Sequence, residues 1–132
     1  MNFAVSCKSF IVSDGKLLII KRMPNDVHKP GVWEIPGGRM DLGESPFRGL
    51  PREVKEEVGL DIKVCQPLAV RHFVREDGQN ITMLVFLCQP LNREVKLSQE
   101  HTEHEWIPVE RAKEKLHRFF HSEINNYLRY YN

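Results

Sequence analysis

Residues 45–60 carry the start and stop signals of a helix, and this segment constrains the fold of the chain most strongly. Ser45 is a natural N-cap with Pro46 at the first helical position, whereas Gly59 and Leu60 are typical of a left-handed C-terminal stop. Between them, apolar residues recur at spacings of three and four, which is the period of a helix with one face on a core. These residues are Phe47, Leu50, Val54 and Val58. The segment therefore predicts an amphipathic helix.

Two residues inside this segment oppose a regular helix. Gly49 destabilises a helix by about 1 kcal/mol relative to alanine. Pro51 lacks a backbone N–H and crowds the carbonyl of Phe47. We therefore expect a bend or a tightened turn between Phe47 and Pro51.

Three carboxylates lie on the polar side of the same predicted helix. Glu56 and Glu57 follow Glu53 by three and four residues, and a rotation of about 100° per residue brings all three onto one face. Like charges at this spacing destabilise an isolated helix by about 0.2–0.5 kcal/mol per pair. A hard divalent cation that prefers oxygen ligands, Mg²⁺ or Mn²⁺, would reverse the sign of that interaction. The trio therefore predicts a metal site.

The positions of these acidic residues resemble the Nudix box, which would span residues 38–60. Gly38 is followed by Glu44 after six positions, and the run from Arg52 to Leu60 supplies the rest of the motif. Every fixed position of the box is filled. On this motif the chain resembles a MutT-like member of the Nudix hydrolase family.

The resemblance continues more weakly on both sides of the box. Residues 31–38 are similar to the strand and turn that enter the box in MutT-like members. Residues 100–106 look like the acidic loop and tryptophan strand that close the domain in many relatives. The departure is Leu50-Pro51, where relatives usually carry small helix formers.

The resemblance implies a metal-dependent hydrolase of a diphosphate bond in a nucleoside diphosphate derivative. It implies Mg²⁺ as the cofactor, with Mn²⁺ as a substitute. The implied ligands are Glu53, Glu56 and Glu57 with the backbone carbonyl of Gly38, where glycine lets the backbone approach a ligand closely. The preferred substrate is a (deoxy)nucleoside triphosphate, cleaved to the monophosphate and pyrophosphate. Two alternatives are an ADP-ribose or nucleotide-sugar pyrophosphatase and a catalytically silent nucleotide-binding sensor domain.

A general base must collect the proton of the attacking water. Relatives place this base either inside the box or in the loop before the tryptophan strand. The candidates are therefore Glu53 in the box, and Glu100 and Glu103 before Trp106. We place Glu103 first among them.

Charged side chains outside the metal set receive two further roles. Phosphate oxygens require cationic partners near the mouth of the site. The candidates are Arg39, which directly follows the double glycine, Arg22 and Lys29. Arg52 and Glu44 are interpreted as structural support, because a guanidinium can hold a carboxylate in a two-pronged geometry and so fix the loop against the helix. His101 and His104 lack a third protein ligand nearby in the sequence, which disfavours zinc.

The remaining apolar runs predict a mixed sheet between helices. Two hairpins with Asp-Gly turns are expected, one from residues 3–12 and 17–23 and one from residues 62–75 and 80–89. Further expected elements are short strands over residues 33–36 and 106–108, a loop over residues 39–44, and a long amphipathic helix over residues 109–131. Strands with a helix on each side give a three-layer α/β/α sandwich, which is also the fold that the resemblance implies.

Length and composition limit the class of protein. The chain of 132 residues and 15.5 kDa suits one domain, assigned to residues 1–132. A net charge of only +1 does not indicate a partner among nucleic-acid polymers. No run approaches the roughly 18 apolar residues of a membrane span, so we expect no membrane partner and a cytoplasmic location. Either a monomer or a homodimer is compatible with the sequence.

Overall fold

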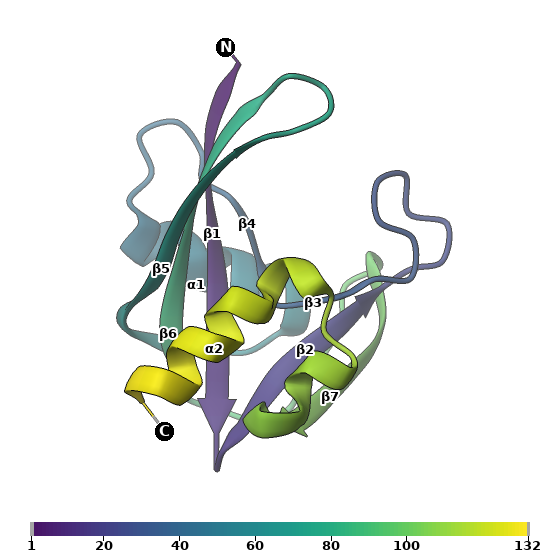
Figure 1. Cartoon of the computed structure of the whole chain (residues 1–132), viewed down its shortest axis with the longest axis vertical. Coiled ribbons are helices and arrows are strands. Elements are labelled where there is room, and N and C mark those ends of the chain that lie inside the picture. Colours follow the sequence, from purple (N-terminus) through teal and green to yellow (C-terminus); the bar gives the residue numbers. More distant parts are fainter. Residues whose placement is uncertain (1, 132) are drawn as a thin grey trace.

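The computed structural model describes residues 2–131, whose strands form one mixed sheet with helices on both faces (Figure 1). The strands are β1 (Phe3–Ser13), β2 (Lys16–Arg22), β3 (Trp33–Glu34), β4 (Gly37–Arg39), β5 (Ile62–Val74), β6 (Asn80–Pro90) and β7 (His101–Pro108). The helices are α1 (Pro46–Val58), α2 (His121–Tyr130) and the short 3₁₀ helices η1 (Val109–Glu114) and η2 (Arg118–Phe120). The predicted mixed sheet between helices is therefore present. Within residues 2–131, the helices are all too short or too polar to span a membrane.

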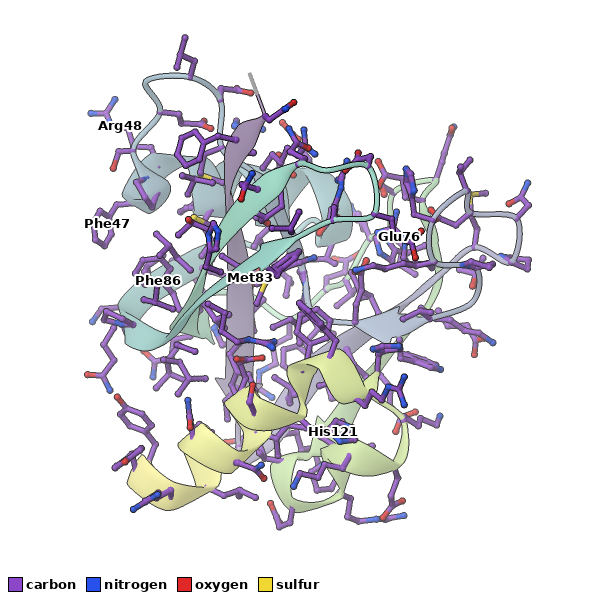
Figure 2. All side chains as sticks on the ribbon, turned by 45° about the horizontal axis from the view of Figure 1, so that its top comes forward. Phe47, Arg48, Glu76, Met83, Phe86 and His121 are labelled. Atoms are coloured by element: carbon purple, nitrogen blue, oxygen red, sulfur yellow. The ribbon has the colours of Figure 1, made fainter. Side chains whose placement is uncertain are left out.

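Alternate residues of the central strands build two separate core layers. Phe10 of β1 packs in a cluster with Phe120 and Ile124 from the η2–α2 side, whereas the next residue, Ile11, packs in a second cluster with Leu50 and other residues of α1. Successive side chains of a strand point to opposite faces, so one strand serves both layers. The apolar side of α1 is buried as predicted, with the exception of Phe47, which is 65% exposed and contacts the Phe86 ring at the edge of the fold (Figure 2).

The sheet divides along β1, and this division creates the space for a site. The strand order is β3–β2–β1–β6–β5, with β4 added to β1 and β7 added to β2. β1 pairs with β6 in parallel along most of its length. On its other side, β1 pairs with β4 at Ser6–Lys8 and with β2 only at Val12 and Ser13. The strands β2, β3 and β7 therefore splay away from β4, β5 and β6, as Figure 1 shows.

Both predicted hairpins form. Asp14 and Gly15 between β1 and β2 adopt positive φ values of 51° and 74°, the two left-handed residues that a tight turn between twisted strands requires. Gly78 has a φ of 83° in the turn between β5 and β6. These Asp-Gly signals therefore specified the turns correctly.

The helix α1 begins and ends where its capping residues predict. The Ser45 side chain accepts a hydrogen bond from the Phe47 N–H, and Gly59 has a φ of 73° and donates to the Lys55 carbonyl. The expected tightening lies at the first turn, where the Ser45 carbonyl accepts from the N–H groups of both Arg48 and Gly49. The helix then continues across Pro51 without interruption.

Three expected boundaries were wrong. Arg39 belongs to β4, because it pairs with Ser6 of β1, so the loop into α1 begins at residue 40. β7 begins at His101 and not at Trp106, because residues 101–108 pair with β2. The long C-terminal helix is broken into η1, η2 and α2, because His117 has an extended backbone and its N–H donates to the Trp33 carbonyl. The apolar residues keep their helical spacing on both sides of His117, so the spacing did not reveal the break.

Candidate active site

A cavity of about 840 Å³ opens where the two parts of the sheet diverge. Its walls come from β1, β4, α1, the segment between β2 and β3, the β5–β6 hairpin and the chain around η2. Glu76, at the rim, marks the hairpin that borders the cavity in Figure 2. Carboxylates of α1 line one part of the cavity and aromatic and cationic side chains, among them Phe73, Lys29 and Phe119, line another, so the cavity has two chemically distinct halves.

The acidic wall contains the predicted metal-binding residues. Gly38, Glu53, Glu56 and Glu57 all line the cavity. Glu57 is only 8% exposed, and its Oε1 accepts a hydrogen bond of 2.8 Å from the Gly37 N–H. A Cβ at Gly38 would lie 2.5 Å from Oε2 of Glu53, so a larger residue here would displace the Glu53 carboxylate from its position.

Burial leaves the charges of this wall poorly compensated. Desolvation raises the pKa of Glu57 to about 7, although Lys8 and the Gly37 N–H oppose the shift. Desolvation also raises the pKa of Glu53, where Arg52 opposes the shift and Glu56 adds to it. A hard cation would supply the missing compensation, since carboxylate and carbonyl oxygens are its preferred ligands. The residues of this wall therefore fit a divalent metal ion.

Arg52 connects the acidic wall to the loop before α1. Its guanidinium binds Glu44 through two hydrogen bonds of 2.7 and 2.8 Å, and its third nitrogen lies 3.2 Å from Glu53 and from Glu56. These bonds hold the pKa of Glu44 at about 2. Glu44 also accepts the N–H of Asp41 in the loop. The pair of Arg52 and Glu44 expected from the sequence is thus present, and the contacts of Arg52 with Glu53 and Glu56 were not predicted.

Comparison with known proteins decides the family. Residues 3–128 match the family described as the NUDIX domain. The chain belongs to the Nudix family. A MutT-like protein of Streptomyces ambofaciens is 34% identical over 114 residues, which cover 86% of this chain and 69% of that protein. The nucleoside triphosphatase NudI of Enterobacter sp. (strain 638) is 34% identical over 110 residues, which cover 76% of this chain and 78% of NudI.

Solved structures agree with this assignment. The MutT protein of Methanosarcina mazei Go1 superimposes with a TM-score of 0.85 at 27% identity, covering 96% of this chain and 94% of that one. The expectation of a MutT-like Nudix hydrolase is therefore confirmed. The protein is a pyrophosphohydrolase that acts on diphosphate bonds, and its class of substrate is the nucleotide derivatives.

The three candidate bases of this Nudix hydrolase lie in different places. Glu53 and Glu100 line the cavity. Glu103 lies opposite Lys21 in the ladder between β7 and β2, has a side chain that is 58% exposed, and forms an ion pair of 3.3 Å with Lys21. The sequence suggested a loop here, but strand pairing from His101 onward directs Glu103 to the outer surface. The geometry thus favours Glu100 or Glu53 over Glu103.

The predicted phosphate-binding cations all line the cavity, although their surroundings differ. Arg39 follows Gly38 on β4 and donates a hydrogen bond to Gln79. Arg22 is engaged by Asp26 at 2.7 Å and by Glu34 at 2.9 Å. Lys29 lies over the Phe119 ring, 5.4 Å from its centroid, in the aromatic half. The partner of Arg39 is an uncharged amide, whereas Arg22 is held by two carboxylates, so Arg39 stays our first candidate for phosphate.

Glu34 is a site residue that the sequence reasoning missed. It is 1% exposed and is surrounded by Lys8, Arg22 and His101, whose nitrogens lie 3.5, 2.9 and 2.8 Å from its oxygens. Although burial opposes the shift, these neighbours hold the pKa of Glu34 well below its usual range. Ligand atoms of Glu34, Glu57 and His101 also lie within 4.8 Å of one another. The sequence signal that could have identified Glu34 is the presence of a glutamate inside a short apolar strand.

Proposed function

We propose that this Nudix hydrolase is a Mg²⁺-dependent enzyme that cleaves a (deoxy)nucleoside triphosphate to the monophosphate and pyrophosphate. The single observation that carries the proposal is the cavity itself, which combines an acidic wall with an aromatic and cationic half. The first half suits a metal-bound polyphosphate, and the second suits a planar base. The names of the relatives, a nucleoside triphosphatase among them, support the same choice.

The metal would be held by Glu53, Glu56 and Glu57 together with the carbonyl of Gly38. A bound divalent cation neutralises phosphate oxygens and lowers the pKa of water, which permits in-line attack on phosphorus. The chain itself fixes these ligands, because the Gly37 N–H holds Glu57 and Arg52 holds Glu53 and Glu56. Such fixed surroundings reduce the reorganisation needed during the reaction.

The proton of the attacking water would pass to Glu100, with Glu53 as the alternative acceptor. Glu100 is an exposed residue that lines the cavity. Two hydrogen bonds fix its backbone: its carbonyl accepts from the Met23 N–H, and its N–H donates to the Ser98 hydroxyl. Arg39 would neutralise the charge that develops on the departing pyrophosphate.

A substrate panel tests the proposal. Ribo- and deoxyribonucleoside triphosphates, ADP-ribose, a nucleotide sugar and a dinucleoside polyphosphate are incubated with Mg²⁺, and the products are separated by anion-exchange chromatography. We expect a nucleoside monophosphate and pyrophosphate in equal amounts, with the triphosphates giving the highest kcat/KM. Higher kcat/KM for ADP-ribose or a nucleotide sugar would transfer the assignment to that class. Binding of nucleotides without turnover would instead indicate a sensor domain.

A further inference from the structure

We infer that Lys8 selects nucleotides whose base carries a carbonyl in place of the amino group of adenine or cytosine, at C6 of a purine or C4 of a pyrimidine, an inference that rests on the proposed function. Lys8 belongs to the aromatic and cationic half of the cavity, where its ammonium group lies 6.0 Å from the centroid of the Phe120 ring. The hydrogen-bond donors and acceptors around this group decide which bases it accepts.

Aromatic rings give this half the shape of a site for a planar group. Phe73 and Phe119 both line it, with ring centroids 5.3 Å apart and planes at 83°. Phe120 lies beyond Phe119, and Met83 adds a polarizable thioether. Because these two rings are nearly perpendicular, a third ring between them would meet the face of one and the edge of the other. Aromatic groups prefer such offset and edge-to-face contacts. A nucleobase fits these walls better than a sugar or a further phosphate.

Three polar side chains next to these rings are donors: Lys8 lies over the Phe120 ring, Lys29 lies over the Phe119 ring, and His117 bonds to the Phe119 backbone. Lys8 and Lys29 are ammonium groups, which have no acceptor atom. The Nδ1 atom of His117 accepts a hydrogen bond from the Phe119 N–H, so its proton resides on Nε2, which is then a donor. Each oxygen of the neighbouring Glu34 already has a cationic or imidazole partner, namely Lys8 on Oε1, and Arg22 and His101 on Oε2. A ligand group that reaches Lys8 therefore meets donors and must supply an acceptor.

Lys8 is the best fixed of these donors. It lies on β1, at the centre of the sheet, and its side chain is 13% exposed. Its ammonium group donates to the Ile35 carbonyl at 3.1 Å and approaches Glu34 at 3.5 Å. Of its three protons, the third has no partner among residues 2–131. Lys29, in contrast, belongs to the segment between β2 and β3. Groups on a rigid strand control specificity better than groups on a loop.

This donor distinguishes bases by one substituent. Guanine, hypoxanthine, uracil and thymine present a carbonyl oxygen where adenine and cytosine present an amino group. The ammonium group of Lys8 donates a hydrogen bond to the carbonyl oxygen. An amino group is itself a donor, so with adenine or cytosine the mostly buried ammonium group would lack an acceptor. A partly desolvated, charged hydrogen bond of this kind discriminates by roughly 10- to 100-fold.

Two substrate pairs test the inference, because each pair differs only in this substituent and the adjoining ring proton. We measure kcat/KM for ITP against ATP and for UTP against CTP, with wild-type protein and with Lys8→Met. The wild-type ratio should favour ITP and UTP about 10- to 100-fold, and Lys8→Met should bring both ratios close to one. Lys8 also stabilises the charge of Glu57, so Lys8→Met slows all substrates, but this common factor cancels in each ratio.

The matched control is Lys63→Met, which removes an exposed lysine of β5 and should leave both ratios unchanged. If Lys8→Met fails to fold, Lys8→Gln replaces it, since an amide offers a donor and an acceptor and should also bring the ratios close to one. Wild-type ratios near one, or ratios that persist in the Lys8 variants, would overturn the inference. An equal loss for all four nucleotides with preserved ratios would assign Lys8 to phosphate instead.

Failure of the proposed function is recognised separately. If no nucleoside triphosphate is hydrolysed, the affinities of ITP and ATP are measured by calorimetry with Ca²⁺ in place of Mg²⁺. Tighter binding of ITP that is lost in Lys8→Met supports the inference, and equal affinities overturn it.

Discussion

Replacement of Glu57 by glutamine should stabilise the metal-free protein above neutral pH. Glu57 is buried, and desolvation raises its pKa from 4.5 to about 7. The folded state therefore binds a proton that the unfolded state has released between these two pH values. Stability falls as the pH rises through this interval and is constant above it. Glutamine has no charge to desolvate, and its side-chain oxygen still accepts a hydrogen bond from the Gly37 N–H. Glu57→Gln should therefore remove this loss of stability at high pH.

The size of the effect follows from the interval. The difference between 4.5 and about 7 corresponds to an upper bound of about 3 kcal/mol, because one pKa unit equals about 1.4 kcal/mol. For a chain of 132 residues this is a shift of about 10 °C in Tm. At pH 4 the two proteins should differ by their packing alone. At pH 8 the variant should gain up to about 3 kcal/mol on top of that difference.

Urea unfolding in the presence of a chelator, at pH 4 and pH 8, measures this difference directly. The matched control is Glu56→Gln, which changes a carboxylate that is 59% exposed and should show the pH dependence of the wild type. Added Mg²⁺ should then stabilise the wild type and have less effect on Glu57→Gln. The reasoning is refuted if Glu57→Gln and the wild type lose the same stability between pH 4 and pH 8.

Two other substitutions test the roles of carboxylates around the same cavity. Glu100→Gln should lower kcat about 10²- to 10⁴-fold with little change in Mg²⁺ affinity. Glu103→Gln should leave kcat unchanged, because Lys21 holds that side chain outside the cavity. Steady-state kinetics in which Glu103→Gln is the slower variant would contradict this order. Glu44→Gln should flatten the dependence of stability on pH in acid. The pKa of Glu44 is lowered to about 2, so this carboxylate contributes stability that is present above pH 4.5 and is lost as the pH falls toward 2. Identical acid unfolding midpoints for variant and wild type, measured by circular dichroism, would refute the role of the Arg52 bond.

Local sequence signals predicted the parts of the fold that local interactions determine. The helix α1 was predictable because Ser45 and Gly59 satisfy its terminal backbone groups from within the segment. The turn between β1 and β2 was predictable because Asp14 and Gly15 tolerate positive φ. The gathering of the box glutamates on one wall followed from helical periodicity alone.

Features that depend on distant pairing could not be read in the same way. The start of β7 at His101 depends on its partner β2, about 80 residues earlier in the chain, and this pairing turned Glu103 away from the cavity. The break at His117 depends on a hydrogen bond to Trp33, so helical spacing of apolar residues gave no sign of it. The buried charges around Glu34 likewise come from three separate strands. Such contacts are set by the tertiary fold and leave only weak traces in the sequence.

The central claim is that the acidic wall binds a divalent cation beside the phosphates of a nucleotide. Crystals grown with Mn²⁺ and a non-hydrolysable nucleoside triphosphate analogue test it, because anomalous diffraction locates manganese directly. We predict an anomalous peak in contact with Glu53, Glu56 and Glu57, the Gly38 carbonyl and the phosphate oxygens. The absence of a peak from this wall, or a peak held instead by Glu34, Glu57 and His101, would contradict the account.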